Sequence, residues 1–304
     1  MLNPHINQPL IVANVHNLVK KILVEAICFD DIVDDLNELY FPFMTSFNFD
    51  FTYSQPVWAF ILSTSVIVGS EYPNDVYWNY DKTRSFIDRL SFYKSDIEYE
   101  NQAFIYQESQ NRRELERYIS SLINHYSRLL FVRIDLKYAL ATSHHVSIED
   151  FDCHMKNLRD LIGNKKTCFK NLQGYAWALE QGSIEGGLHC HLLLMYDGSK
   201  RQNDWHLAKK VGEKWQDITD GLGEYYSYHG KEVKHQYSQY DNLGIGMIHR
   251  NNATQVGNAL RTALYLTKPE KTDQHLKLKV QGMRTFGHGQ YRIAKRRSLP
   301  PIAN

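Results

Sequence analysis

Apolar residues recur at helical intervals in two stretches of the first part of the chain. Over residues 10–40 they fall three and four positions apart, and the same spacing returns over residues 82–126. The stretch between them is rich in acidic and aromatic residues and has no clear period. We therefore expect residues 1–120 to form a mainly helical accessory region, for which the sequence indicates no role.

A strand pattern begins near residue 128 and marks a change in the chain. Dense apolar runs follow one another there, and a turn-rich segment, Gly182–Gly187, separates two of them. The predicted strands are residues 129–136, 175–180 and 188–196. Two strands joined by a short turn form a hairpin. We therefore expect an antiparallel α+β sheet with helices on one face, and not a doubly wound parallel sheet.

Helices are predicted between and after these strands from their capping residues. Ser147 followed by Asp150 forms a capping box, and the last helix should run to Lys268, where Pro269 stops it. The predicted helices start at Ser147, at Asp204, and at Asn252 or Thr254. We assign residues 121–304 to a second domain, since 304 residues suffice for two domains.

The composition is that of an ordinary folded protein. Hydrophobic residues make up 43% of the chain and charged residues 23%, which excludes a disordered or fibrous protein. The first 30 residues lack a secretory signal, and the longest apolar stretch, Val57–Gly69, is too short for a membrane span. The four cysteines show no CxxC spacing. We expect a cytoplasmic protein with reduced thiols and no membrane partner.

The near-neutral net charge of +1 hides an asymmetry between the two parts of the chain. Residues 1–120 hold 9 Lys and Arg against 17 Asp and Glu, a net charge of −8. Residues 121–304 hold 26 Lys and Arg against 17 Asp and Glu, a net charge of +9. If the chain binds a polyanion such as a nucleic acid, the second part should carry the binding surface.

The first chemical motif is His189-Cys190-His191 in the third predicted strand. Because side chains alternate across a strand, the two histidines share one face and Cys190 takes the other. Two neighbouring imidazoles on a rigid strand suit a divalent metal. A His-x-His pair taken alone is more often a surface or hydrogen-bonded pair than a metal site.

Glu180 on the preceding strand would complete a set of three ligands. If the hairpin loop has an even number of residues, Glu180 lies on the histidine face. It then faces His189 for a turn centred on Ser183–Gly186, or His191 for a turn on Glu185–Gly186. A loop with an odd number of residues would place Glu180 on the opposite face. Glu185, in the turn, is the weaker ligand candidate. Two histidines and one carboxylate leave metal positions open, as in a catalytic site.

The second chemical motif is Tyr265-Leu266-Thr267-Lys268, near the end of the last predicted helix. Tyr265 and Lys268 are three residues apart and would share one helix face. A nearby ammonium ion stabilises a phenolate and so favours attack by the phenol oxygen. The motif alone is weak, because the chain contains 20 tyrosines.

In this order, a strand with Arg133 and Asp135, the His-x-His strand and the Tyr-x-x-Lys helix resemble the HUH endonuclease superfamily. The closest likeness is to the replication initiators of filamentous phages (inoviruses) and their prophage relatives. The resemblance covers about residues 125–290 and leaves the N-terminal region uncovered. The segments that carry it are Leu130–Tyr138, Leu179–Gly182, Gly187–Leu194, Ala263–Lys268 and Arg284–Gly287.

The resemblance implies a sheet of the HUH or Rep type and a rolling-circle initiator that nicks single-stranded origin DNA. The family's metal ligands correspond to His189, His191 and Glu180, its nucleophile to Tyr265 and its helper lysine to Lys268. The reaction would leave a 5′-phosphotyrosine and a free 3′-hydroxyl, which a host helicase and polymerase would then use. Mg²⁺ or Mn²⁺ suits phosphoryl transfer, and the imidazoles favour Mn²⁺.

One position departs from the pattern of some relatives. They carry a second tyrosine one helical turn before the first, where this chain has Arg261. A relay between two tyrosines on one helix is therefore excluded, and rejoining needs a second protomer, a second nicking cycle or another group. The candidate DNA contacts are Arg133, Lys137, Arg261, Lys295, Arg296 and Arg297.

Three other functions remain open at this point. A relaxase or transposase of the same superfamily would use identical chemistry. A non-catalytic DNA-binding protein with this fold would have lost part of the site, yet His189, His191, Tyr265 and Lys268 are all present. A metal-dependent enzyme acting on a small molecule would use the same ligands and form no covalent adduct with DNA.

Overall fold

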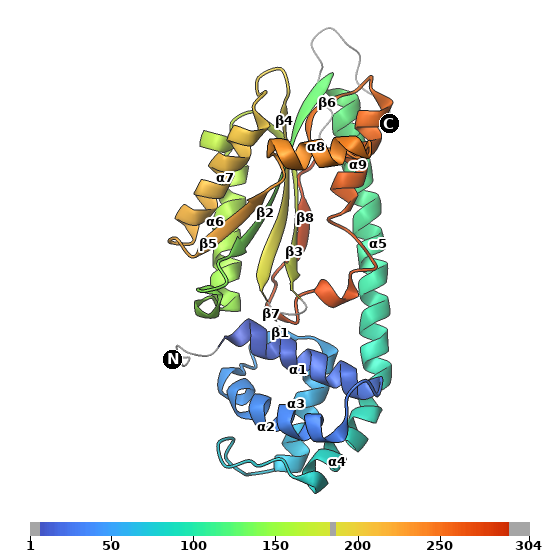
Figure 1. The fold of residues 1–304 in the computed structure, drawn as a ribbon, viewed down its shortest axis with the longest axis vertical. Coiled ribbons are helices and arrows are strands. Elements are labelled where there is room, and N and C mark those ends of the chain that lie inside the picture. The colour runs from blue at the N-terminus through green and yellow to red at the C-terminus, as the bar shows by residue number, and fades with distance from the viewer. Residues whose placement is uncertain (1–6, 183–186, 292–304) are drawn as a thin grey trace.

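The computed structural model describes residues 7–182 and 187–291 (Figure 1). Its largest element is an antiparallel sheet with the strand order β5-β2-β4-β3-β8, in which β6 also pairs with β2. The strands are β2 (Arg128–Tyr138), β3 (Leu172–Gln181), β4 (Leu188–Asp197), β5 (Gly223–Ser227), β6 (Gly246–His249) and β8 (Phe286–His288). The α+β class and the antiparallel hairpin are confirmed.

Helices cover both faces of this sheet, and not one face as expected. Figure 1 shows α6 (Ile148–Asn164) and α7 (Asp204–Ile218) on one side, and α5 (Lys94–His125) and α9 (Ala253–Leu264) on the other. The reason lies in the apolar run of β2, where the adjacent side chains of Phe131 and Val132 are both fully buried. Phe131 packs toward α5 and α9, and Val132 packs toward α6 and α7. A strand buried on both faces loses the alternation of a one-sided sheet.

The N-terminal region is helical, as predicted, and forms a separate layer at one end of the sheet (Figure 1). Its elements are α1 (Gln8–Leu23), α2 (Phe29–Ser46), β1 (Phe51–Tyr53), α3 (Gln55–Val68) and α4 (Tyr80–Leu90). A short ladder between β1 and β7 (Leu278–Val280) and the long helix α5 connect this layer to the rest. Within the described ranges, no helix has the length and apolar content of a membrane span.

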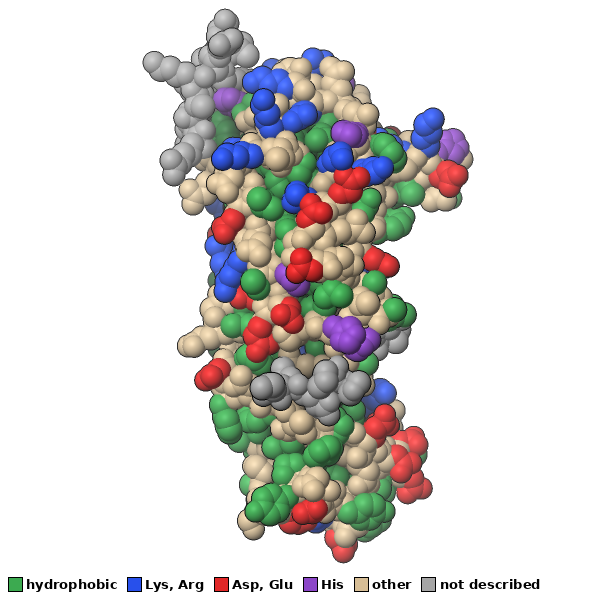
Figure 2. Space-filling view, turned by 90° about the vertical axis from the view of Figure 1, so that its left-hand side faces the viewer, with side chains coloured by type: hydrophobic (Ala, Val, Ile, Leu, Met, Phe, Trp, Pro, Cys, Tyr) green, Lys and Arg blue, Asp and Glu red, His purple; other side chains and the backbone are tan. Residues whose placement is uncertain are grey.

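The charge asymmetry of the sequence is also an asymmetry in space. On the face shown in Figure 2, Lys and Arg side chains gather over the upper part, which belongs to the sheet domain. In the lowest part, formed by the N-terminal helices, hydrophobic side chains are also visible, and the charged ones are mainly Asp and Glu. The positive surface therefore lies on the same domain as the chemical motifs.

Two helix boundaries differ from the prediction. α7 is capped by Asn203, whose side-chain oxygen accepts from the backbone N–H of His206 at 2.9 Å, and not by Asp204. α9 starts after Asn252 as expected but ends at Leu264, before Lys268. Proline has no N–H, and its ring clashes with the carbonyl four residues earlier. For Pro269 that carbonyl belongs to Tyr265, so the helical hydrogen bonds cannot continue through Pro269, and Tyr265 is the C-cap residue of α9.

We expect Gly244→Ala to destabilise the protein by about 1–3 kcal/mol, because overpacking forces the backbone to shift. A Cβ at Gly244 would lie 2.2 Å from the carbonyl oxygen of Asn258 in α9, which cannot rotate away. Gly257→Ala, in α9, is the control, since a Cβ at Gly257 meets nothing within 4 Å. It should stabilise the protein by about 0.5–1 kcal/mol. Urea unfolding measures the change in the free energy of unfolding for both variants. Equal changes in the two variants would contradict the packing argument.

Candidate metal centre and tyrosine site

The end of β3 and the start of β4, which pair next to the hairpin loop, bring three possible metal ligands together. Glu180 lies directly opposite His189 across the ladder, so the histidine-facing register is confirmed, in the first of the two alignments considered. The ligand atoms of Glu180, His189 and His191 all lie within 4.8 Å of one another. The Oε2 atom of Glu180 is 3.1 Å from Nε2 of His191 and 3.5 Å from Nε2 of His189. The triad is thus a candidate metal centre.

The chemistry of these side chains fits a divalent ion. Two imidazole nitrogens and one carboxylate oxygen converge from rigid strands, and three protein ligands leave coordination positions for other groups. Burial by itself raises the pKa of Glu180, but hydrogen bonds from His189, His191 and Lys271 outweigh it and hold the pKa below its ordinary value. The carboxylate is therefore ionised, which is the form that binds a cation.

Asp135 supports the triad from the neighbouring strand. It lies opposite His191 in the β2–β4 ladder, and its Oδ1 atom is 2.7 Å from Nδ1 of His191. A carboxylate on Nδ1 fixes the ring orientation and directs Nε2 toward the metal position. The hydroxyl of Tyr228 donates to the other carboxylate oxygen of Asp135 at 2.6 Å. The sequence placed Asp135 in a predicted strand but did not reveal this role.

Tyr265 lies beside the triad, immediately after the end of α9. Its ring centroid is 5.8 Å from that of His191, with the rings nearly perpendicular. Two lysine ammonium groups lie close to the ring, Lys268 at 4.3 Å and Lys271 at 4.1 Å from its centroid. The sequence predicted that Tyr265 and Lys268 lie together on a helix face. They do lie together, but in the turn that follows the helix.

Lys271 joins the tyrosine to the triad and was not found from the sequence. Its ammonium group donates to both carboxylate oxygens of Glu180, at 2.9 and 3.0 Å, while it also lies over the ring of Tyr265. The available signal was its position three residues after Lys268. That spacing has no structural meaning without knowledge of how the chain turns at Pro269.

Arg133 lies within the site and is largely buried. Its guanidinium carbon is 4.4 Å from the ring centroids of both Tyr265 and Tyr228. Its backbone N–H donates to Nε2 of the buried His229, at 3.0 Å, and Nδ1 of that ring is 2.6 Å from Asp204. The guanidinium group of Arg133 thus lies against the rings of both tyrosines, beside the triad.

The remaining predicted DNA contacts lie outside the triad. Lys137 is exposed, pairs with Glu224 at 3.7 Å and borders a cavity of about 640 Å³ that also reaches His189. Arg261 is exposed on α9 and donates to Asn258 and Asn242. The basic cluster of Lys295, Arg296 and Arg297 lies outside the described residues, as does Glu185.

A family model, described as the YagK/YfjJ C-terminal domain, matches residues 91–289, about two thirds of the chain. The chain belongs to this family. The family domain contains the whole triad, Asp135 and the turn from Tyr265 to Lys271, and it begins upstream of residue 121, so that α5 lies within it. No curated protein and no solved structure matches this chain.

We expect Asp135→Asn to weaken Mn²⁺ binding about 10- to 100-fold, because the charge that orients His191 is lost. Isothermal titration calorimetry of the full chain with Mn²⁺ measures the affinity. Glu224→Gln on the neighbouring strand removes an exposed carboxylate and is the matched control. Equal affinity of the two variants would show that Asp135 does not support the triad.

We expect Asp204→Asn to destabilise the protein by about 1–3 kcal/mol, because it weakens a buried hydrogen-bonded group. Burial raises the pKa of Asp204, but hydrogen bonds from His229 and Lys234 outweigh it and lower the pKa to about 2. The stabilisation is therefore complete above the ordinary aspartate pKa of about 3.9 and is lost as the pH falls toward 2. Denaturant unfolding between pH 2 and pH 7 should show a weaker acid dependence in the variant. If the free energy of unfolding of the variant depended on pH in the same way as that of the wild-type protein, the role assigned to Asp204 would be contradicted.

Proposed function

We propose that this protein is a metal-assisted single-strand DNA endonuclease and strand transferase of the HUH type, acting as a rolling-circle replication initiator. The observation that carries the proposal is the position of Tyr265, whose ring lies 5.8 Å from a histidine of the candidate metal centre. The order of the motifs in the sequence and the antiparallel sheet support the same assignment. Origin DNA is the proposed substrate, with Mg²⁺ or Mn²⁺ as the cofactor.

The cofactor would be held by Glu180, His189 and His191, and it would polarise the scissile phosphate. The phenol oxygen of Tyr265 attacks the phosphorus, so that a phosphorus–tyrosine bond forms while the bond to the 3′ oxygen breaks. The phenol loses its proton and the departing 3′ oxygen gains one. The products are a 5′-phosphotyrosine and a 3′-hydroxyl, and because the covalent link keeps the phosphodiester energy, the strand can be rejoined.

Three cations lie around the ring of Tyr265. Arg133, Lys268 and Lys271 all have their charged groups within 4.4 Å of the centroid of the Tyr265 ring. Fixed positive charges in a partly buried site stabilise the negative charge that develops on the transferring phosphoryl group. The lysines also counter the charge that the phenol oxygen acquires. This arrangement gives the Tyr-x-x-Lys motif a role that an enzyme acting on a small uncharged molecule would not need.

Tyr228 is the other tyrosine in this site, and its environment makes it a poor nucleophile. Its hydroxyl is bound to Asp135, which lies on the Nδ1 side of His191, away from Glu180. Burial and the nearby carboxylate of Asp135 raise the pKa of Tyr228 above its ordinary value. We therefore assign the attack to Tyr265 alone, and rejoining to a second protomer or a second nicking cycle.

We expect Tyr265→Phe to abolish the covalent protein–DNA adduct, because the attacking oxygen is removed. The test incubates the protein with the single strand of its own replicon and Mn²⁺, followed by denaturing electrophoresis and peptide mapping. Tyr226→Phe is the control, since Tyr226 is about half exposed and lies in β5 beside Tyr228. An adduct that persists in Tyr265→Phe, or that maps to another residue, would refute the nucleophile. Wild-type protein that forms no adduct would refute the proposed function.

A further inference from the structure

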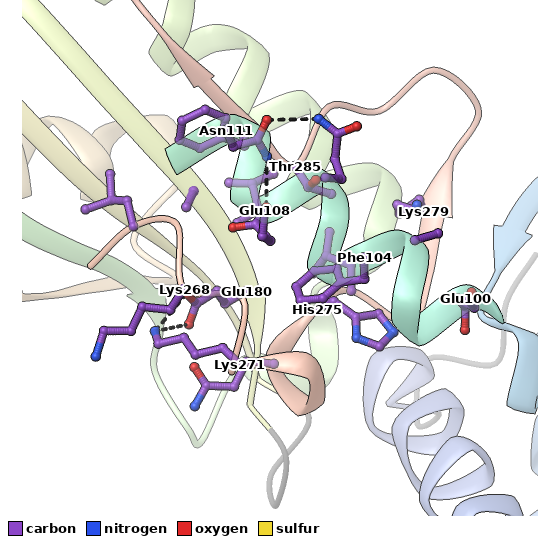
Figure 3. Close-up of a pocket in the computed structure, with 18 residues that line it drawn as sticks. Glu100, Phe104, Glu108, Asn111, Glu180, Lys268, Lys271, His275, Lys279 and Thr285 are labelled. Carbon is purple, nitrogen blue, oxygen red and sulfur yellow. Dashed lines mark hydrogen bonds and ion pairs between the residues drawn. The ribbon is translucent and has the colours of Figure 1, made fainter. Parts of the chain in front are cut away.

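A second cavity opens directly beside the candidate metal centre. It has a volume of about 390 Å³ and lies between α5, the end of β3 and the chain that follows α9 (Figure 3). Glu180, Lys268 and Lys271 form one side of it, so it is continuous with the site of phosphoryl transfer. Its volume is in the range of pockets that enclose small organic ligands.

We propose that this cavity binds one unpaired nucleobase of the cleaved strand, next to the scissile phosphate. The inference rests on the proposed function and adds a base-specific subsite to it. The walls change in character with distance from the metal centre, and each part of the wall matches a different part of a nucleotide.

The side near Tyr265 suits the backbone phosphate. Lys268 and Lys271 are the cations there, and both ammonium groups lie within 4.3 Å of the ring centroid of Tyr265. Phosphates bind to such ammonium groups without regard to sequence. Farther from Tyr265 the carboxylates of Glu108 and Glu100 border the cavity together with the ammonium group of Lys279, so the wall there has mixed charge, and we place a base there and not the backbone (Figure 3).

The middle of the cavity carries two aromatic rings. Phe104 of α5 and His275 lie with their ring centroids 5.3 Å apart at an angle of 40°, and both border the cavity. Burial, together with the charge of Lys277, lowers the pKa of His275 to about 4, so its ring is neutral near pH 7. Unpaired bases stack on such rings.

A fixed row of hydrogen-bonding groups on α5 lies beside these rings. Gln107 donates to the side-chain oxygen of Asn111 at 3.1 Å, and Asn111 donates to Glu108 at 2.8 Å. These bonds set the orientation of the amides and leave Glu108 as a hydrogen-bond acceptor at the wall. Carboxylates accept hydrogen bonds from the exocyclic amino group of cytosine. The wall therefore favours a base with an amino group over uracil or thymine, which present a carbonyl there.

The test measures binding of fluorescent oligo-dC, oligo-dU and oligo-dT to the full chain by anisotropy at one ionic strength. Tyr265→Phe protein is used throughout, so that no cleavage intervenes. We expect oligo-dC to bind about five-fold or more tightly than oligo-dU. Glu108→Gln should remove this preference, because an amide can both donate and accept. Phe104→Ala should weaken binding of all three about ten-fold.

Two further variants separate the pocket from general effects. Tyr106→Ala removes an exposed aromatic side chain from the same helix, outside the cavity, and should bind like the parent protein. Phe104→Tyr keeps a ring for stacking and should bind like the parent protein. The inference is overturned if Phe104→Ala and Tyr106→Ala bind alike, or if the parent and Glu108→Gln show the same base preference. Base-dependent binding, together with the absence of an adduct when wild-type protein is incubated with DNA, would overturn the proposed function and leave the pocket standing.

Discussion

The ionised carboxylate of Glu180 is the interaction on which the site depends. It is buried at the end of β3, where an unpaired charge would be strongly destabilising. Three groups compensate it, and they come from two parts of the chain: His189 and His191 from β4, and Lys271 from the segment after α9. The same contacts that satisfy the charge therefore also hold the turn that carries Tyr265 against the sheet. A divalent cation at the triad would take the place of the Nε2–H protons of the two histidines as the positive partner of this carboxylate.

The early end of α9 is what makes this contact possible. If the helix continued to Lys268, Tyr265 would be one more residue on a helical surface. Pro269 has no N–H to donate to the carbonyl of Tyr265, and Arg112 of α5 donates to the carbonyls of Leu264 and Thr267 at 3.1 and 3.4 Å. The turn after the helix places three polar side chains, Tyr265, Lys268 and Lys271, in one site. One arginine on α5, distant in the sequence, thus helps to hold the turn that carries the proposed nucleophile.

Features set by local rules could be predicted from the sequence. The shared face of His189 and His191 follows from strand alternation, and the capping box at Ser147 is present with both hydrogen bonds. The face of the sheet on which Glu180 lies depended only on whether the hairpin loop has an even or an odd number of residues. The roles of Asp135, Lys271 and Phe104 could not be predicted, because they depend on the β2–β4 register and on where α5 lies. Those arrangements arise from packing between distant segments, which no local pattern encodes.

Charge and shape together constrain how a polyanion can approach. The N-terminal layer carries the acidic excess and lies at one end of the sheet, where β1 pairs with β7 (Figure 1). The basic excess belongs to the domain that holds the triad. The DNA strand of the proposed function would therefore be repelled from the acidic end and attracted toward the domain that holds Arg133, Lys268 and Lys271. For that strand the acidic region would narrow the directions of approach to Tyr265, even without a site of its own.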